Sequence, residues 1–131
     1  MTKLIHSMIR VEDDAASIKF YADAFGLFVA EQLDFESFRL TYLSNANGSF
    51  ELELTLNKKQ TEPYELGSGY GHLAVSVDDL DVAHARYQKL DIAVGDIVAF
   101  APAGELIARF CFVTDPDGYK IEVIERGGRF K

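Results

Sequence analysis

Short stretches in which apolar and polar residues alternate recur along the chain, and this two-residue period is typical of half-buried strands. In the clearest stretch, 50–56, the even positions are apolar and the odd positions are polar. The pattern predicts eight strands, over 5–11, 27–33, 37–43, 50–56, 72–77, 97–101, 107–113 and 119–125. Turns are expected at Asn47-Gly48, because both residues tolerate positive φ, and at the Asp-Pro-Asp-Gly run of 115–118.

Two segments have the start signals of helices instead. Asp13 or Asp14 can cap a helix that runs to about 25, where Gly26 supplies the stop, and Asp79 can cap a second helix that runs to about 90. We expect these helices to cover the apolar side of the neighbouring strands. The contacting side chains would include Ile18, Tyr21, Tyr87 and Leu90.

The same order of elements occurs twice along the chain, as an internal repeat. A shift of 66 residues aligns 6–13 with 72–79, so that His6 matches His72, and a shift of 69 residues aligns 50–54 with 119–123. Each half therefore predicts a βαβββ module, about 1–66 and 67–131. One such module leaves a sheet face uncovered, so we expect a single α+β domain, 1–131, in which the two modules form a cupped half-barrel.

Composition narrows the functional class. The 131 residues carry a net charge of −8, which argues against a nucleic-acid surface, and no apolar run approaches the length that crosses a bilayer. Charged residues appear early, unlike in a secretory signal, and the one cysteine cannot form an internal disulfide. We therefore expect a cytoplasmic protein without nucleic-acid or membrane partners.

Candidate metal ligands occupy matching positions in the repeat: His6 and His72 at the start of one strand, Glu53 and Glu122 on another. Taken singly, a carboxylate on a strand is more often solvent-facing, and a lone histidine is more often a satisfied or exposed side chain than a ligand. We expect the latter for His84, which lies in the middle of the second predicted helix and has no partner in the repeat. A two-fold arrangement of the halves would instead bring all four side chains to one point. Two imidazoles and two carboxylates suit nickel, cobalt, zinc, iron or manganese, and leave octahedral positions open for substrate.

The chain resembles glyoxalase I (lactoylglutathione lyase) of the vicinal oxygen chelate superfamily over nearly its whole length. The similar motifs are His-Ser-Met-Ile-Arg at 6–10, Glu-Leu-Thr-Leu-Asn at 53–57, Tyr-Glu-Leu-Gly-Ser-Gly-Tyr-Gly-His at 64–72 and Asp-Pro-Asp-Gly-Tyr-Lys-Ile-Glu at 115–122. The resemblance implies a homodimer with metal sites at the interface, each taking one His–Glu pair from each subunit. It also implies one divalent ion per site, nickel or cobalt in preference to zinc, and glutathione held by Arg10 and Asn57.

Two regions depart from the family pattern. Lys58-Lys59 stands where many relatives have Trp-Gly, and 103–108 lacks a lysine and paired glycines that are common before the last ligand strand. Both regions would border the thiol-binding groove. The departures leave the expected metal ligands intact, and they leave open which thiol and which aldehyde the protein uses.

The activity that the resemblance implies is isomerisation of the methylglyoxal–glutathione hemithioacetal to S-lactoylglutathione. Glu122 is the preferred general base, and Glu53 faces it and can share the proton transfer. Alternatives with the same fold are a metal-dependent epimerase, an iron dioxygenase that would not need Glu53, and a non-catalytic binder of small molecules such as antibiotics. A metal that only stiffens the protein is a further alternative.

Overall fold

The computed structural model describes residues 1–131 and divides into two compact units, Met1–Glu65 and Leu66–Lys131. The division lies next to the boundary that the repeat predicts between the modules. Each unit consists of one four-stranded mixed sheet and one helix. That the two units together form a single domain, 1–131, stays a prediction.

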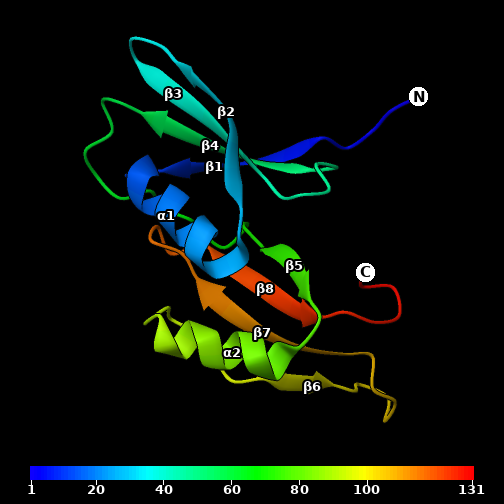
Figure 1. Cartoon of the computed structure of the whole chain (residues 1–131). Coiled ribbons are helices and arrows are strands. Elements are labelled where there is room, and N and C mark those ends of the chain that lie inside the picture. Colours follow the sequence, from blue (N-terminus) through cyan, green and yellow to red (C-terminus); the bar gives the residue numbers. More distant parts are fainter. The chain divides into compact units, whose positions relative to one another are not determined.

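The first unit contains β1 (His6–Val11), α1 (Asp14–Phe25), β2 (Phe28–Asp34), β3 (Phe38–Ser44) and β4 (Glu51–Asn57). Its strands lie in the order β1-β4-β3-β2, with β1 parallel to β4 and the other neighbours antiparallel. The first and last strands of the unit are therefore hydrogen-bonded neighbours (Figure 1). This pairing brings the two predicted ligand strands of the first half side by side.

The second unit repeats the arrangement with β5 (Leu73–Val77), α2 (Leu80–Lys89), β6 (Val98–Phe100), β7 (Ala108–Thr114) and β8 (Lys120–Glu125). Its strand order is β5-β8-β7-β6, and β5 runs parallel to β8 (Figure 1). The prediction of an α+β fold with two βαβββ repeats is confirmed. The closure of the two sheets into a half-barrel stays a prediction.

Both helices begin and end where the sequence indicates. The Asp13 carboxylate accepts a hydrogen bond from the Ala16 backbone N–H, and Gly26 ends α1 with a left-handed φ of 68°. The Asp79 carboxylate accepts from the Val82 N–H at the start of α2. These side chains satisfy backbone donors that a helix leaves without an intrahelical partner.

The core of each unit lies between its helix and one face of its sheet. Tyr21 and Tyr87 are almost completely buried, as expected, whereas Leu90 is 45% exposed and the expectation for it is wrong. Leu90 is the C-cap of α2, where the backbone leaves helical geometry with φ −86° and ψ 3°, so its side chain no longer follows the buried face of the helix. No helix of the structure combines the length and the apolar character needed to span a bilayer.

The two turns that the sequence predicts are held differently. Gly48 has a φ of 60°, whereas Asn47 stays at negative φ and accepts hydrogen bonds from Ser49 through its side chain. In the second turn the buried Asp115 carboxylate accepts from the backbone N–H groups of Asp117 and Tyr119, both at 2.9 Å. This second turn leads directly into β8 and fixes where that strand begins.

Candidate metal centre

The first candidate pair, His6 and Glu53, lies on the sheet face opposite the core of the first unit. His6 begins β1, and Glu53 lies in the adjacent parallel strand β4. Their apolar neighbours Ile9 and Leu54 point to the helix side and are buried. The two polar side chains meet, with His6 Nε2 3.1 Å from Glu53 Oε2.

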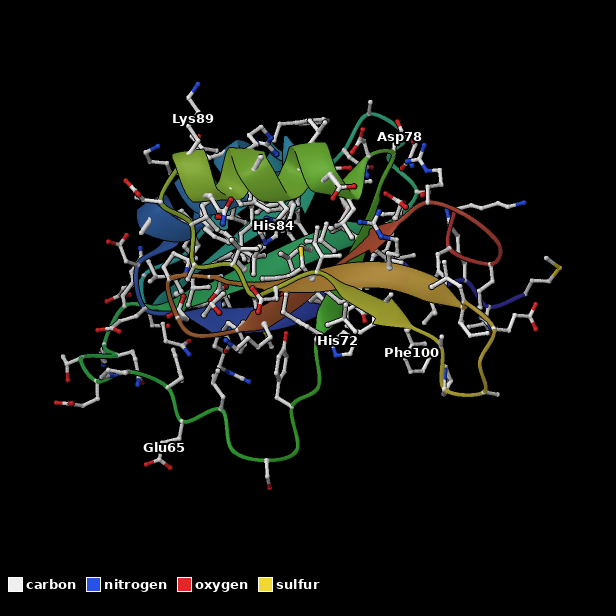
Figure 2. All side chains as sticks on the ribbon, turned by 90° about the horizontal axis from the view of Figure 1, so that it is seen from below. Glu65, His72, Asp78, His84, Lys89 and Phe100 are labelled. Atoms are coloured by element: carbon white, nitrogen blue, oxygen red, sulfur yellow. The ribbon has the colours of Figure 1, made fainter.

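The second pair, His72 and Glu122, repeats this geometry in the second unit. His72 comes immediately before β5, and His72 Nε2 lies 3.3 Å from Glu122 Oε1 in β8. Figure 2 shows His72 on the side of the sheet away from α2. The imidazole is 42% exposed and the carboxylate 17%, so the pair lies at a surface that a ligand can reach.

The donor atoms of each pair are spaced as two ligands of one metal ion would be. Nitrogen and carboxylate ligands lie roughly 2.0–2.2 Å from zinc, so two of them at tetrahedral or right angles are about 3.0–3.5 Å apart. The measured separations of 3.1 and 3.3 Å fall in this range. Each unit thus offers one imidazole nitrogen and one carboxylate oxygen that fit a divalent ion.

Arg10 and Asn57, the expected thiol-binding residues, share the sheet face of the first pair. Arg10 is opposite Thr55 in the β1–β4 register, and Asn57 ends β4. Asn57 donates a hydrogen bond from Nδ2 to the Tyr64 hydroxyl at 3.1 Å. Residues two apart on a strand point to the same face, so His6 and Arg10 project together, as do Glu53 and Asn57.

An aromatic ring flanks each histidine, and the pattern of the sequence does not identify either ring. Tyr42 of β3 lies edge-on to His6, with ring centroids 6.0 Å apart, and Phe112 of β7 lies edge-on to His72 at 5.2 Å. Their strands show alternation, but the repeat offset there is 70 residues rather than 66 or 69. Only the observed strand register shows which glutamate each ring faces.

A separate acidic group forms at the start of α2 from Asp79, Asp81 and Glu125. Arg109 donates to the carboxylates of Asp81 and Glu125 at 3.1–3.2 Å, and Glu125 also accepts from the Leu80 backbone N–H. Asp79 is the helix cap. Because all three carboxylates already have cationic or N–H partners, we attribute a structural role to this group.

His84, which has no counterpart in the repeat, lies outside both pairs. Its Nε2 atom is 2.9 Å from the Gly95 carbonyl oxygen, so it joins α2 to the segment before β6. Figure 2 shows His84 on the helix side of the sheet, whereas His72 is on the other side. The expectation that His84 is not a ligand agrees with this position.

Comparison with known proteins identifies the family to which this chain belongs. Residues 3–123 match the family model described as Glyoxalase/Bleomycin resistance protein/Dioxygenase superfamily. The lactoylglutathione lyase of Neisseria meningitidis serogroup B is 37% identical over 129 residues, covering 95% of this chain and 91% of that protein. The lactoylglutathione lyase of Haemophilus influenzae is 36% identical, covering 94% of this chain and 92% of its own. The chain belongs to the glyoxalase superfamily and is an enzyme of the glyoxalase I type.

Solved glyoxalase I structures share this fold. Leishmania major glyoxalase I, described as trypanothione-dependent, has a TM-score of 0.77 and 34% identity, covering 95% of this chain and 87% of that one. Zea mays glyoxalase I has a TM-score of 0.84 and 27% identity over 96% of this chain and 45% of that longer one. The resemblance to glyoxalase I seen in the sequence is therefore confirmed.

For this glyoxalase, the structure brings together each predicted His–Glu pair within its own unit. His6 meets Glu53, and His72 meets Glu122. The convergence of both pairs on one ion, and the roles of Arg10 and Asn57, stay predictions. They enter the functional proposal below.

Proposed function

We propose that the chain catalyses the metal-dependent isomerisation of the methylglyoxal–glutathione hemithioacetal to S-lactoylglutathione, and so removes methylglyoxal. The observation that carries the proposal is the duplicated His–Glu pair, with nitrogen–oxygen distances of 3.1 and 3.3 Å at matching positions of the repeat. A binding protein without catalysis has no need of two such pairs. The lactoylglutathione lyases of similar length add support.

In this proposal His6, Glu53, His72 and Glu122 hold one divalent ion, with nickel or cobalt preferred and zinc as the alternative. When bound, the ion acts as a Lewis acid toward two neighbouring substrate oxygens, which makes the adjoining C–H acidic enough to transfer its proton. The Glu122 carboxylate takes the proton from one carbon and returns it to the next. Glu53 faces the same carbons and can share this transfer.

Arg10 and Asn57 are the proposed contacts for the thiol. A guanidinium suits the carboxylates of glutathione, because its planar N–H groups pair with both oxygens of one carboxylate. The Asn57 amide nitrogen donates to the Tyr64 hydroxyl at 3.1 Å, and this bond fixes the orientation of the amide group. In this orientation the amide oxygen can accept a hydrogen bond from a peptide N–H of the thiol. Both residues lie on the face that carries the first His–Glu pair.

Lys58 and Lys59 directly follow Asn57 and would border the thiol-binding groove, so their positions affect which thiol the protein accepts. Lys58 Nζ is 2.7 Å from an Asp34 carboxylate oxygen and 2.5 Å from the Phe35 carbonyl oxygen. Its ammonium thus joins the end of β4 to the β2–β3 hairpin. Glutathione is the proposed thiol, and trypanothione, used by the Leishmania major relative, is the comparison that the 34% identity justifies.

The proposal includes a homodimer in the cytoplasm, with each site built from both subunits. Each unit by itself supplies only two protein ligands, whereas a catalytic ion of this kind needs at least three. A second pair must therefore come from the other unit of the same chain or of a partner. The substrate in either case is a small molecule.

The test is an assay of metal-free protein reconstituted with Ni²⁺, Co²⁺ or Zn²⁺ and supplied with methylglyoxal and glutathione. We expect ultraviolet absorbance of the thioester product to rise only with metal and thiol together. A parallel arm with trypanothione determines the thiol. No turnover with any metal and either thiol would overturn the proposed reaction.

Glu122→Gln separates lyase chemistry from binding alone. The amide keeps the shape of the side chain but cannot accept a proton, so we expect turnover to fall by roughly 10²–10⁴-fold while metal is retained. Metal content, measured by atomic absorption, serves as the control. Full activity in this variant would exclude Glu122 as the base and favour Glu53.

A further inference from the structure

The two halves of the proposed metal site differ at one matching position. Tyr42 is opposite Glu53 in the antiparallel register of β3 and β4. Phe112 is opposite Glu122 in the register of β7 and β8. Directly opposite residues on one sheet face have Cβ atoms about 5 Å apart, so each ring lies against its glutamate.

Apart from the hydroxyl, the two aromatic residues are placed alike. The Tyr42 ring meets the His6 ring at 69°, and the Phe112 ring meets the His72 ring at 84°, both edge-on. Both aromatic side chains are half-buried. The repeat therefore preserves one aromatic ring beside each His–Glu pair. The two rings differ in whether they carry a hydrogen-bond donor.

In the first half the aromatic residue places a hydroxyl group beside the glutamate. Burial, followed by a hydrogen bond to the Glu53 carboxylate, raises the pKa of the Tyr42 hydroxyl. Between a phenol and an ionised carboxylate on directly opposite residues, the O–H is the only possible donor and the carboxylate oxygen the acceptor. Glu53 lies 3.1 Å from His6 Nε2 and has the Tyr42 phenol opposite it, whereas a phenylalanine ring gives Glu122 no equivalent donor.

An outer donor of this kind fixes a ligand carboxylate. It satisfies lone pairs that the metal leaves free and restricts rotation of the side chain, and loss of such partners typically costs 10–100-fold in metal affinity or activity. A carboxylate without the donor turns more freely. The proposed role of Glu122 as the preferred base suits one glutamate of each kind, with one that stays on the metal and one that moves a proton.

We propose that Tyr42 is a positioning residue that holds Glu53 as a fixed metal ligand, and that Phe112 leaves Glu122 free to act as the base. This inference rests on the proposed function and deepens it. It gives a structural cause for the different roles proposed above for two carboxylates that the repeat makes equivalent. The difference of a single oxygen atom between the two rings carries the assignment.

The first experiment titrates metal-free Tyr42→Phe with Co²⁺ and follows the visible absorbance of the bound ion against a competing chelator. We expect the dissociation constant for Co²⁺ to rise by about 10-fold, with the melting temperature of the metal-free protein little changed. Tyr21→Phe is the matched control, because it removes a hydroxyl from a buried tyrosine of α1 in the same unit. We expect Tyr21→Phe to bind Co²⁺ like the wild type.

The mirror variant, Phe112→Tyr, gives Glu122 the donor that it lacks. We expect kcat to fall by about 10-fold with KM nearly unchanged, since a tethered carboxylate transfers a proton less readily. Its affinity for Co²⁺ should be equal to or tighter than that of the wild type. A merely structural effect of the added hydroxyl would instead change stability and KM.

The outcomes separate this inference from the reaction proposed above. Wild-type protein that binds no metal would remove both. Wild-type protein that binds Co²⁺ and turns over, together with a Tyr42→Phe variant whose dissociation constant stays within about twofold, would overturn only the role of Tyr42. An unchanged kcat in Phe112→Tyr would overturn the assignment of Glu122 as the freer carboxylate.

Discussion

Cys111 illustrates how strongly position in a strand determines the chemistry of a residue. It lies in β7 next to Phe112, but its side chain points to the helix side of the sheet and is completely buried. Burial raises the pKa of the thiol above its usual value. The side chain therefore behaves as a small core residue and not as a nucleophile.

We predict that a disulfide reagent labels Cys111 slowly in the native protein at mildly alkaline pH. The raised pKa lowers the thiolate fraction and burial blocks access, so the native rate should be at least about 100-fold below that in concentrated urea. The chain has one cysteine, so absorbance of the released reagent reports this position alone. Rapid native labelling would show that β7 opens readily.

The environments of Glu53 and Glu122 show how much of a residue's surroundings can be predicted from the sequence. Alternation along 50–56 correctly placed Glu53 on the polar face, and the repeat correctly matched it to Glu122. Alternation does not reveal which residue of a neighbouring strand faces a given position, because this depends on the offset of the hairpin. Tyr42 was missed for that reason.

At the scale of elements, helix ends were the best-predicted features. Asp13, Gly26 and Asp79 act through local hydrogen bonds or local φ, so their effect is readable from a few neighbouring residues. The Asn47-Gly48 turn was less well predicted, because only Gly48 takes positive φ. Strand ends shift by a residue or so, and strand order depends on contacts far apart in the sequence.

The Gly26 cap gives a test of this local reasoning. Gly26→Ala places a Cβ on a residue with φ 68°, and since nothing lies within 4 Å of that Cβ, the cost is conformational only. We predict a loss of about 1 kcal/mol in the free energy of unfolding, measured by urea denaturation. Gly69→Ala is the control, because Gly69 has open space and no positive φ. Equal stability of both variants would contradict the capping role.

At the scale of the whole molecule, metal binding should be coupled to stability. An ion that binds only the folded state at about 100 times its dissociation constant adds about 2.7 kcal/mol, which for a chain of this size corresponds to a rise in melting temperature of roughly 10 °C. We predict such a rise when Ni²⁺ or Co²⁺ is added to chelator-treated protein, measured by calorimetry. His72→Ala should abolish the rise and His84→Ala should retain it, because His72 faces a glutamate of the proposed site whereas His84 contacts a backbone carbonyl on the helix side. A rise that survives in His72→Ala would place the metal elsewhere.

The source of the second His–Glu pair is the question that the repeat leaves open, and complementation between subunits answers it. One variant lacks His6 and Glu53, the other lacks His72 and Glu122, and neither retains a complete site. If each site takes one pair from each subunit, a mixed dimer has one site with all four ligands and one with none. Half of a random mixture is mixed dimer, so co-refolding should restore about a quarter of wild-type turnover. If each chain closes its own site, a mixed dimer contains only half-sites, and the mixture stays inactive.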